Sequence, residues 1–155
     1  MNIQERIETL ETEFNEKIKA LKAEVQQEKE FPQEDDMFWV INTFGKPVGS
    51  TWGESITNRQ LIEIGNMFRT KDEAEFAVEK LKVEAELQKF GRPFEPTADN
   101  FFMVYDKYLE SLENNCSLKT DIQGVIYFGS REELRKAAQS VGVDRIKKYI
   151  FGVED

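Results

Sequence analysis

Side chains that commonly carry catalysis or bind metals are scarce in this sequence of 155 residues. It has no histidine and a single cysteine, Cys116, which excludes Ser-His-Asp and Cys-His catalysis and the usual zinc sites. The remaining chemistry is that of carboxylates, and Asp35 and Asp36 are adjacent in an expected linker. The other candidate acids lie on polar faces or in first turns of expected helices, where solvation and the helix dipole account for them. We therefore predict no enzymatic activity, no metal site and no cofactor.

Basic residues interleaved with aromatic ones near the C-terminus form the second candidate functional site. Arg145, Lys147 and Lys148 stand beside Tyr149 and Phe151. Such a pattern could contact phosphates and stack bases. It is also what two amphipathic helices look like when their aromatic side chains belong to the core. Because nearby acids dilute the positive charge, we favour the core, with nucleic-acid contact as the alternative.

Negative charge is concentrated in the N-terminal part of the chain. Of a net charge of −9, residues 1–36 contribute −6, from eleven acids and five bases. Such a region repels polyanions and attracts basic protein surfaces, although the simpler interpretation is a solvated helix. The acidic side chains that we predict to contact a partner are Glu5, Glu8, Glu11, Glu13, Glu16, Asp35 and Asp36.

The spacing of apolar residues predicts one long amphipathic helix over residues 1–31. Their intervals of 4, 3, 4, 4, 3 and 4 residues keep them on one face of a nearly straight helix. Because such a helix depends on packing for its stability, we expect the apolar stripe to be covered. It could fold back on its own domain, but we favour self-association, as in a coiled coil, or docking onto a partner. The residues predicted to make this contact are Ile3, Ile7, Leu10, Phe14, Ile18, Leu21 and Val25.

Residues 37–155 are predicted to form one α+β domain behind a linker at residues 32–36, where Pro32 interrupts the helical pattern. The domain begins with an aromatic and β-branched run, Met37–Phe44, and the turn behind it predicts a hairpin. A short helix is expected over Thr57–Ile64.

Two Ser/Thr-x-x-Glu capping boxes, at residues 70–73 and 130–133, mark the starts of two further helices. A shift of 60 residues superimposes these boxes and the apolar positions behind them. We therefore predict two β-β-α pseudo-repeats, residues 37–90 and 101–155, which pack a small antiparallel sheet against helices. The strands expected in the second unit are residues 101–105 and 124–128.

Several distinctive strings carry a family resemblance. They are Phe38–Asn42, Ser50–Trp52, Gly65–Glu75, Glu79–Val83 and Gly142–Tyr149. Together they resemble a set of small uncharacterised accessory proteins encoded by phages and prophages of Gram-positive bacteria. The resemblance spans most of residues 37–151, leaves out the N-terminal helix, and transfers no catalytic residue.

The resemblance implies an accessory role in a phage cycle. Small acidic phage proteins without enzymatic activity often inhibit host defence factors, so we expect an anti-CRISPR-like or other anti-defence inhibitor. Its expected partners are a host protein, such as a nucleic-acid-processing defence complex, and a second copy bound through the N-terminal helix. A nucleic-acid-binding accessory protein and a phage assembly or structural component are the alternatives.

The expected compartment is the cytoplasm of an infected or lysogenic bacterium. No apolar run approaches the roughly 18–20 residues that span a membrane, and the N-terminus lacks the pattern of a secretory signal. A single cysteine fits a reducing compartment. We expect no membrane partner.

Overall fold

The computed structural model describes residues 3–28 and 31–154, without the side chains of residues 5 and 23–28. Its architecture is α+β, as predicted, with an N-terminal helix and two antiparallel hairpins packed against further helices. The elements are α1 (Ile3–Glu28), β1 (Met37–Ile41), β2 (Pro47–Thr51), α2 (Ile56–Glu63), α3 (Lys71–Gln88), β3 (Asn100–Asp106), β4 (Ser111–Ser117), α4 (Arg131–Val141) and α5 (Val143–Phe151).

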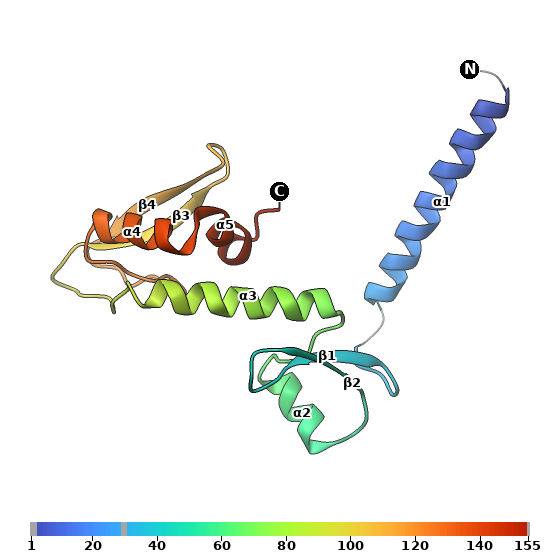
Figure 1. Ribbon diagram of the computed structural model, residues 1–155, viewed down its shortest axis with the longest axis horizontal. Helices are drawn as coiled ribbons and strands as arrows, with labels where there is room; N and C mark the ends of the chain where they lie inside the picture. The colour runs from blue at the N-terminus through green and yellow to red at the C-terminus, as the bar shows by residue number, and fades with distance from the viewer. Residues whose placement is uncertain (1–2, 29–30, 155) are drawn as a thin grey trace.

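Helix α3 lies between the two hairpins (Figure 1). The β1–β2 hairpin and α2 are on one side of it, and β3, β4, α4 and α5 are on the other. We refer to residues 31–154, which contain everything except α1, as the body. The β1–β2 hairpin with α2 is the first half of the body, and β3, β4, α4 and α5 are the second half. Helix α3 contacts both halves.

The first half covers the N-terminal part of α3. Strands β1 and β2 pair antiparallel, and the ring of Phe38 is buried beneath them, edge-on to Trp52 with 6.4 Å between ring centroids. Ala74 and Val78 are the buried side chains in this part of α3. The first half is therefore held by one buried aromatic ring against small side chains of the helix.

The second half contains the larger core. It joins α3 to the β3–β4 hairpin, α4 and α5, and its members alternate along the helices as amphipathic spacing requires. The buried residues of this cluster are Val83, Leu87, Met103, Phe128, Leu134, Ala137, Ala138, Val141 and Ile146.

The strands differ from the prediction in two ways. The two hairpins form separate two-stranded sheets and not one small sheet. The predicted strand at residues 124–128 is wrong, because β3 pairs instead with Ser111–Ser117. Residues of the 124–128 segment make only isolated bridges, Tyr127 to Arg92 and Phe128 to Phe101. An apolar composition had indicated a strand where the chain instead supplies core side chains from an extended segment.

The same hydrogen-bonded junction precedes α3 and α4. Phe68 exchanges two backbone hydrogen bonds with Trp39, and Phe128 exchanges two with Phe101. Two residues later, a side chain caps each helix: Thr70 Oγ1 accepts from the Glu73 amide at 3.2 Å, and Ser130 Oγ accepts from the corresponding amide at 3.1 Å. The duplication of residues 37–90 and 101–155 remains a prediction. The junctions before α3 and α4 have the same arrangement of hydrogen bonds, which agrees with it.

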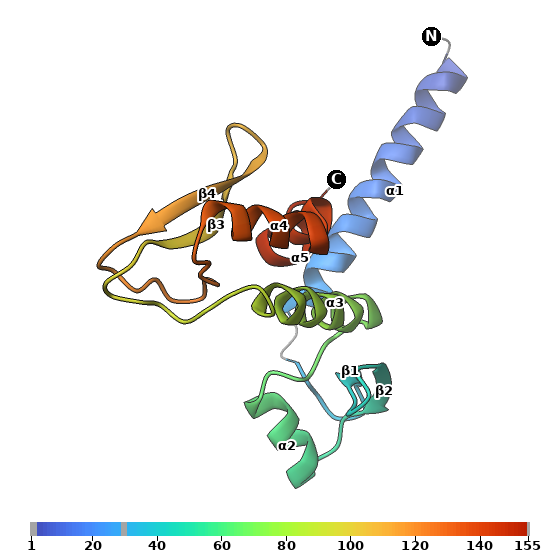
Figure 2. The same cartoon turned by 60° about the vertical axis from the view of Figure 1, so that its left-hand side comes forward.

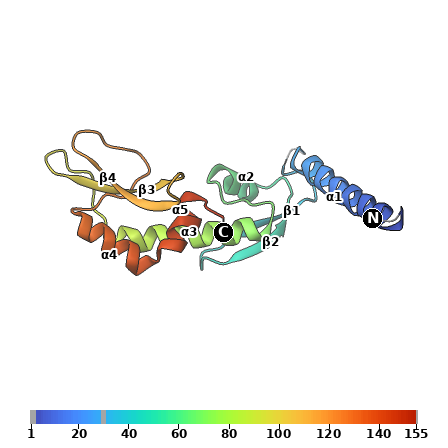
Figure 3. The ribbon, with the colours of Figure 1, turned by 90° about the horizontal axis from the view of Figure 1, so that it is seen from above.

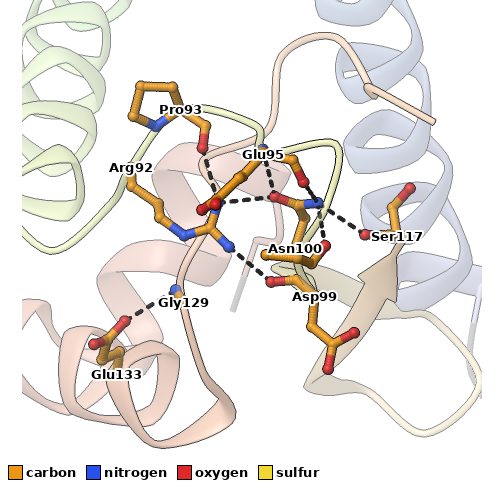
Figure 4. Close-up of polar contacts among 9 residues, drawn as sticks. Arg92, Pro93, Glu95, Asp99, Asn100, Ser117, Gly129 and Glu133 are labelled. Carbon is orange, nitrogen blue, oxygen red and sulfur yellow. Dashed lines mark hydrogen bonds and ion pairs between the residues drawn. The ribbon is translucent and has the colours of Figure 1, made fainter. Parts of the chain in front are cut away.

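A buried asparagine closes the loop between α3 and β3 (Figure 4). Asn100 has no exposed surface, and its Oδ1 accepts from Arg92 Nη1 at 2.9 Å and from the Glu95 amide at 2.8 Å. Its Nδ2 donates to the backbone oxygens of Glu95, Ala98 and Ser117. One side chain therefore pairs the polar backbone groups of an irregular loop with the end of β4.

We predict that Asn100→Ala lowers the free energy of unfolding by about 3 kcal/mol, because it leaves several buried donors and acceptors without partners. Urea denaturation of both proteins measures the difference. The matched control is Asn114→Ala, on the exposed part of β4, which should change stability by less than about 0.5 kcal/mol. Equal effects of the two substitutions would contradict a structural role for Asn100.

Candidate docking surface on the N-terminal helix

The apolar stripe of α1 is uncovered. Of the predicted contact residues, Ile3, Ile7, Leu10, Phe14 and Leu21 have exposed side chains, and Ile18 is half-exposed. Leu10 and Phe14, near the middle of the helix, keep 63% and 64% of their surface. The side chain of Val25 lies outside the described part of the structure. The helix therefore presents the stripe that its sequence predicts, without folding back on the body.

Helix α1 projects from the N-terminal end of the body. Figures 2 and 3 show α1 extending away from the body, with its N-terminus farthest from it. Where the body begins, the ring of Phe31 lies 4.8 Å below the Arg69 guanidinium. The Asp35 amide then donates to the oxygen of Trp52 at 3.3 Å, and the Trp52 amide donates to the oxygen of Asp36 at 2.8 Å. The segment predicted as a linker is thus a turn bonded to the end of β2.

The acidic residues predicted to contact a partner fall into two groups. Glu8, Glu11, Glu13 and Glu16 are exposed, and among the described side chains they form no ion pair. Asp35 is exposed too, whereas Asp36 is half-buried and its Oδ2 accepts from the Gln33 amide at 2.8 Å. The side chain of Glu5 is outside the described part. The first group keeps its negative charge available, and Asp36 has a structural role in the turn.

The basic residues near the C-terminus are largely engaged within the body. Arg145 donates from Nη1 and Nη2 to the two carboxylate oxygens of Glu86, at 2.9 and 3.1 Å, and thereby ties α5 to α3. Lys147 Nζ donates to the backbone oxygen of Glu110 at 3.0 Å. Lys148 Nζ lies 5.7 Å from the ring centroid of Tyr149. Arg145, one of the three predicted nucleic-acid contacts, has its guanidinium committed to ion pairs within the body.

This ion pair shifts the ionisation of both partners. The hydrogen bond from Arg145 holds the pKa of the Glu86 carboxyl below its ordinary value, although partial desolvation opposes the shift. The same hydrogen bond raises the pKa of Arg145. Both groups therefore stay charged over the neutral range, and the contact between α3 and α5 persists there.

A second exposed apolar feature was missed from the sequence. The turn between β3 and β4 carries Tyr108 and Leu109, which are 93% and 61% exposed. Because the polar strand Ser111–Ser117 was not predicted, residues 107–110 were not recognised as a hairpin tip. The signal that could have found it is the Asp106 side chain, a common turn former, whose Oδ1 accepts from the amides of residues 108 and 109.

The body also contains an apolar cavity of about 330 Å³ between α3, α5 and the 124–128 segment. Glu84 and Gln88 contribute polar side chains to its wall. Such a cavity could hold an apolar group, but it brings together no acid–base pair of the kind that catalysis needs. Its apolar lining comes from Leu87, Met103, Val125, Ile126, Phe128, Ile146, Ile150 and Phe151.

Within residues 3–28 and 31–154, no three Cys, Asp or Glu side chains gather as metal ligands would. None of the helices in the described ranges combines the length and the apolar content needed to span a bilayer.

No protein-family model matches the chain, and no curated protein or solved structure is significantly similar to it.

We predict that Glu86→Gln lowers the melting temperature at pH 7, because it removes the two-bond ion pair of Arg145 and leaves only the 3.9 Å contact of Arg145 with Glu79 between α5 and α3. The pKa of Glu86 is lower in the folded than in the unfolded state, so its contribution is present above the ordinary pKa of 4.5 and is lost as the pH falls through the folded-state value. The difference in melting temperature between the two proteins should therefore shrink as the pH is lowered below 4.5.

The control is Glu84→Gln, since among the described residues Glu84 forms an ion pair only with Lys80 of its own helix, at 4.0 Å. It should cost less at pH 7 than Glu86→Gln. Calorimetry between pH 3 and pH 7 measures both variants, and a difference for Glu86→Gln that is constant with pH would refute the assignment.

Proposed function

We propose that this chain is a non-enzymatic phage accessory protein that binds and inhibits a host defence factor, with α1 as its docking element. The observation that carries the proposal is that α1 projects from the body with its glutamates unpaired among the described side chains. Four of these, Glu8, Glu11, Glu13 and Glu16, are exposed. A structural helix of a self-contained domain would be covered, whereas a docking helix has to be accessible.

Electrostatics favours a basic protein surface as the target. Clustered negative charge speeds association with a positive patch and disfavours acidic partners. Enzymes that process nucleic acids have basic grooves for the phosphate backbone, and an acidic helix in such a groove would compete with their substrate. A defence complex that acts on nucleic acids therefore fits the charge of α1.

The phage setting rests on the resemblance of residues 37–151 to small accessory proteins of phages and prophages. Direct nucleic-acid binding has less support, because Arg145 is engaged by Glu86 and Lys147 by Glu110. The acidic N-terminal segment would also repel a polyanion. A host protein is therefore the partner that we propose.

We expect a tagged copy to co-purify a basic host protein or complex from a nuclease-treated lysate. Replacing Glu8, Glu11, Glu13 and Glu16 together by Gln should weaken that binding by about tenfold or more, because four charges facing the partner are lost. The matched control neutralises four exposed glutamates of the body, Glu54, Glu63, Glu113 and Glu154, and should bind as the parent does. Equal loss in both variants would show that binding follows net charge and not α1.

The inhibitory role has its own test in infected cells. Expression of the chain should raise phage plaquing on a strain with the targeted defence system, and it should have no effect on a strain from which that system is deleted. The Gln variant of α1 should lose this rescue while the body variant keeps it. A panel of defence systems in which none is inhibited would refute the proposal.

A further inference from the structure

The spacing of the apolar residues in the stripe of α1 is the same from either end of the helix. Its intervals, 4, 3, 4, 4, 3 and 4 residues, are symmetric about Phe14. Position n therefore has an apolar counterpart at position 28 − n: Ile7 matches Leu21, and Leu10 matches Ile18. At roughly 100° per residue, all seven stripe positions fall within about 40° of Phe14 around the helix axis. Two such helices placed antiparallel would therefore match stripe to stripe over their whole length.

The charges of α1 favour the same orientation. Residues 3–13 carry four acids and one base, a net charge of −3, and residues 15–25 carry two acids and three bases, a net charge of +1. An in-register parallel pair would place the two acidic halves side by side. An antiparallel pair places each acidic half against the basic half of the other helix, which is favourable.

One pair of flanking residues makes this complementarity specific. Glu13 and Lys17 lie on the same flank of the stripe, on either side of its centre near Phe14. In an antiparallel pair the same flanks of the two helices face each other, so Lys17 of each copy meets Glu13 of the other. The two contacts are equivalent by symmetry, as a two-fold interface requires.

We propose that the partner of the α1 stripe is α1 of a second copy of this chain, bound antiparallel about a two-fold axis at Phe14. The 11-residue repeat keeps the stripe nearly straight, so the helices pack side by side with little supercoiling. Each body then lies beyond one end of a two-helix rod about 39 Å long, from 26 residues at 1.5 Å each.

This pairing does not depend on the proposed target. Glu8 and Glu16 lie on the side of α1 away from the stripe, about 120° and 160° from Phe14 around the axis, so they stay exposed in the pair. Dimerisation and acidic docking can therefore occur together. Because Glu13 also belongs to the contact between the two helices, Glu8→Gln combined with Glu16→Gln is the variant that tests docking without disturbing the pair.

Light scattering of the purified full chain should give twice the 18.1 kDa of one chain. Phe14→Asp, at the centre of the pair, should reduce the mass to that of one chain. The control is Phe44→Asp, which changes an aromatic side chain that is 84% exposed on the β1–β2 turn and should leave the dimer intact. A wild-type chain that is monomeric at about 100 μM, or one that forms trimers or tetramers, overturns the proposal. Circular dichroism and urea unfolding check that the body stays folded in each variant.

Orientation is tested by disulfide trapping in a Cys116→Ser background, since Cys116 is exposed. A mixture of Ile7→Cys and Leu21→Cys chains should yield the mixed dimer, and Ile7→Cys alone should not cross-link. Efficient cross-linking of Ile7→Cys alone would mean a parallel pair and would overturn the proposal.

The charge contact is tested by reversal. Lys17→Glu should weaken dimerisation by about tenfold, because each copy then sets a negative charge against Glu13 of the other. Adding Glu13→Lys should restore it. If the double variant is as weak as the single one, the antiparallel register is wrong.

Discussion

The packing of both halves of the body against one helix, α3, is the constraint on which the body depends. Helix α3 has 18 residues, and its buried side chains divide along its length. Ala74 and Val78 are buried in the part of the helix that the first half covers, whereas Val83 and Leu87 belong to the core of the second half. Leu81, between the two pairs, is 55% exposed. The hairpins are small, and each would be marginal alone. The first hairpin packs on α3 directly, whereas β3 packs with α4 and shares the core that α3 and α5 complete.

The backbone junctions complete this arrangement. Before α3 and α4 alike, a Phe is bridged to the first strand of a hairpin, and a Thr or Ser then caps the helix that follows. Arg69 and Gly129 occupy the same place in the two junctions, and each donates its amide at 2.9 Å to the side chain of the Glu in the first turn of the helix. Hairpin and helix are thereby bonded together through the chain between them. The orientation of each hairpin relative to the helix that follows the junction, α3 for the first and α4 for the second, is set by local hydrogen bonds as well as by core packing.

The parts of the fold that depend on periodicity and capping could be predicted from the sequence. The boxes at Thr70 and Ser130 marked the starts of α3 and α4, and the apolar stripe marked α1. Strand β4 was missed because Ser111–Ser117 is polar and mostly exposed, and it is held by pairing with β3 rather than by burial. The roles of Asn100 and Arg145 depend on partners up to 59 residues away, Glu86 among them, which no local pattern indicates. For the docking surface, the sequence supplied the stripe and the acids, and only the structure showed that the body leaves both uncovered.

The separateness of α1 has a consequence for how this protein can evolve. All the buried apolar side chains of the described chain lie between Phe38 and Ile146, so none belongs to α1. Substitutions on the surface of α1 therefore leave the core of the body unaffected, so the body's packing does not constrain the sequence of the helix. The body, in contrast, tolerates little change at positions such as Ala74 and Ala137, which have no exposed surface. Sequences of this architecture should thus diverge faster along the helix than in the body.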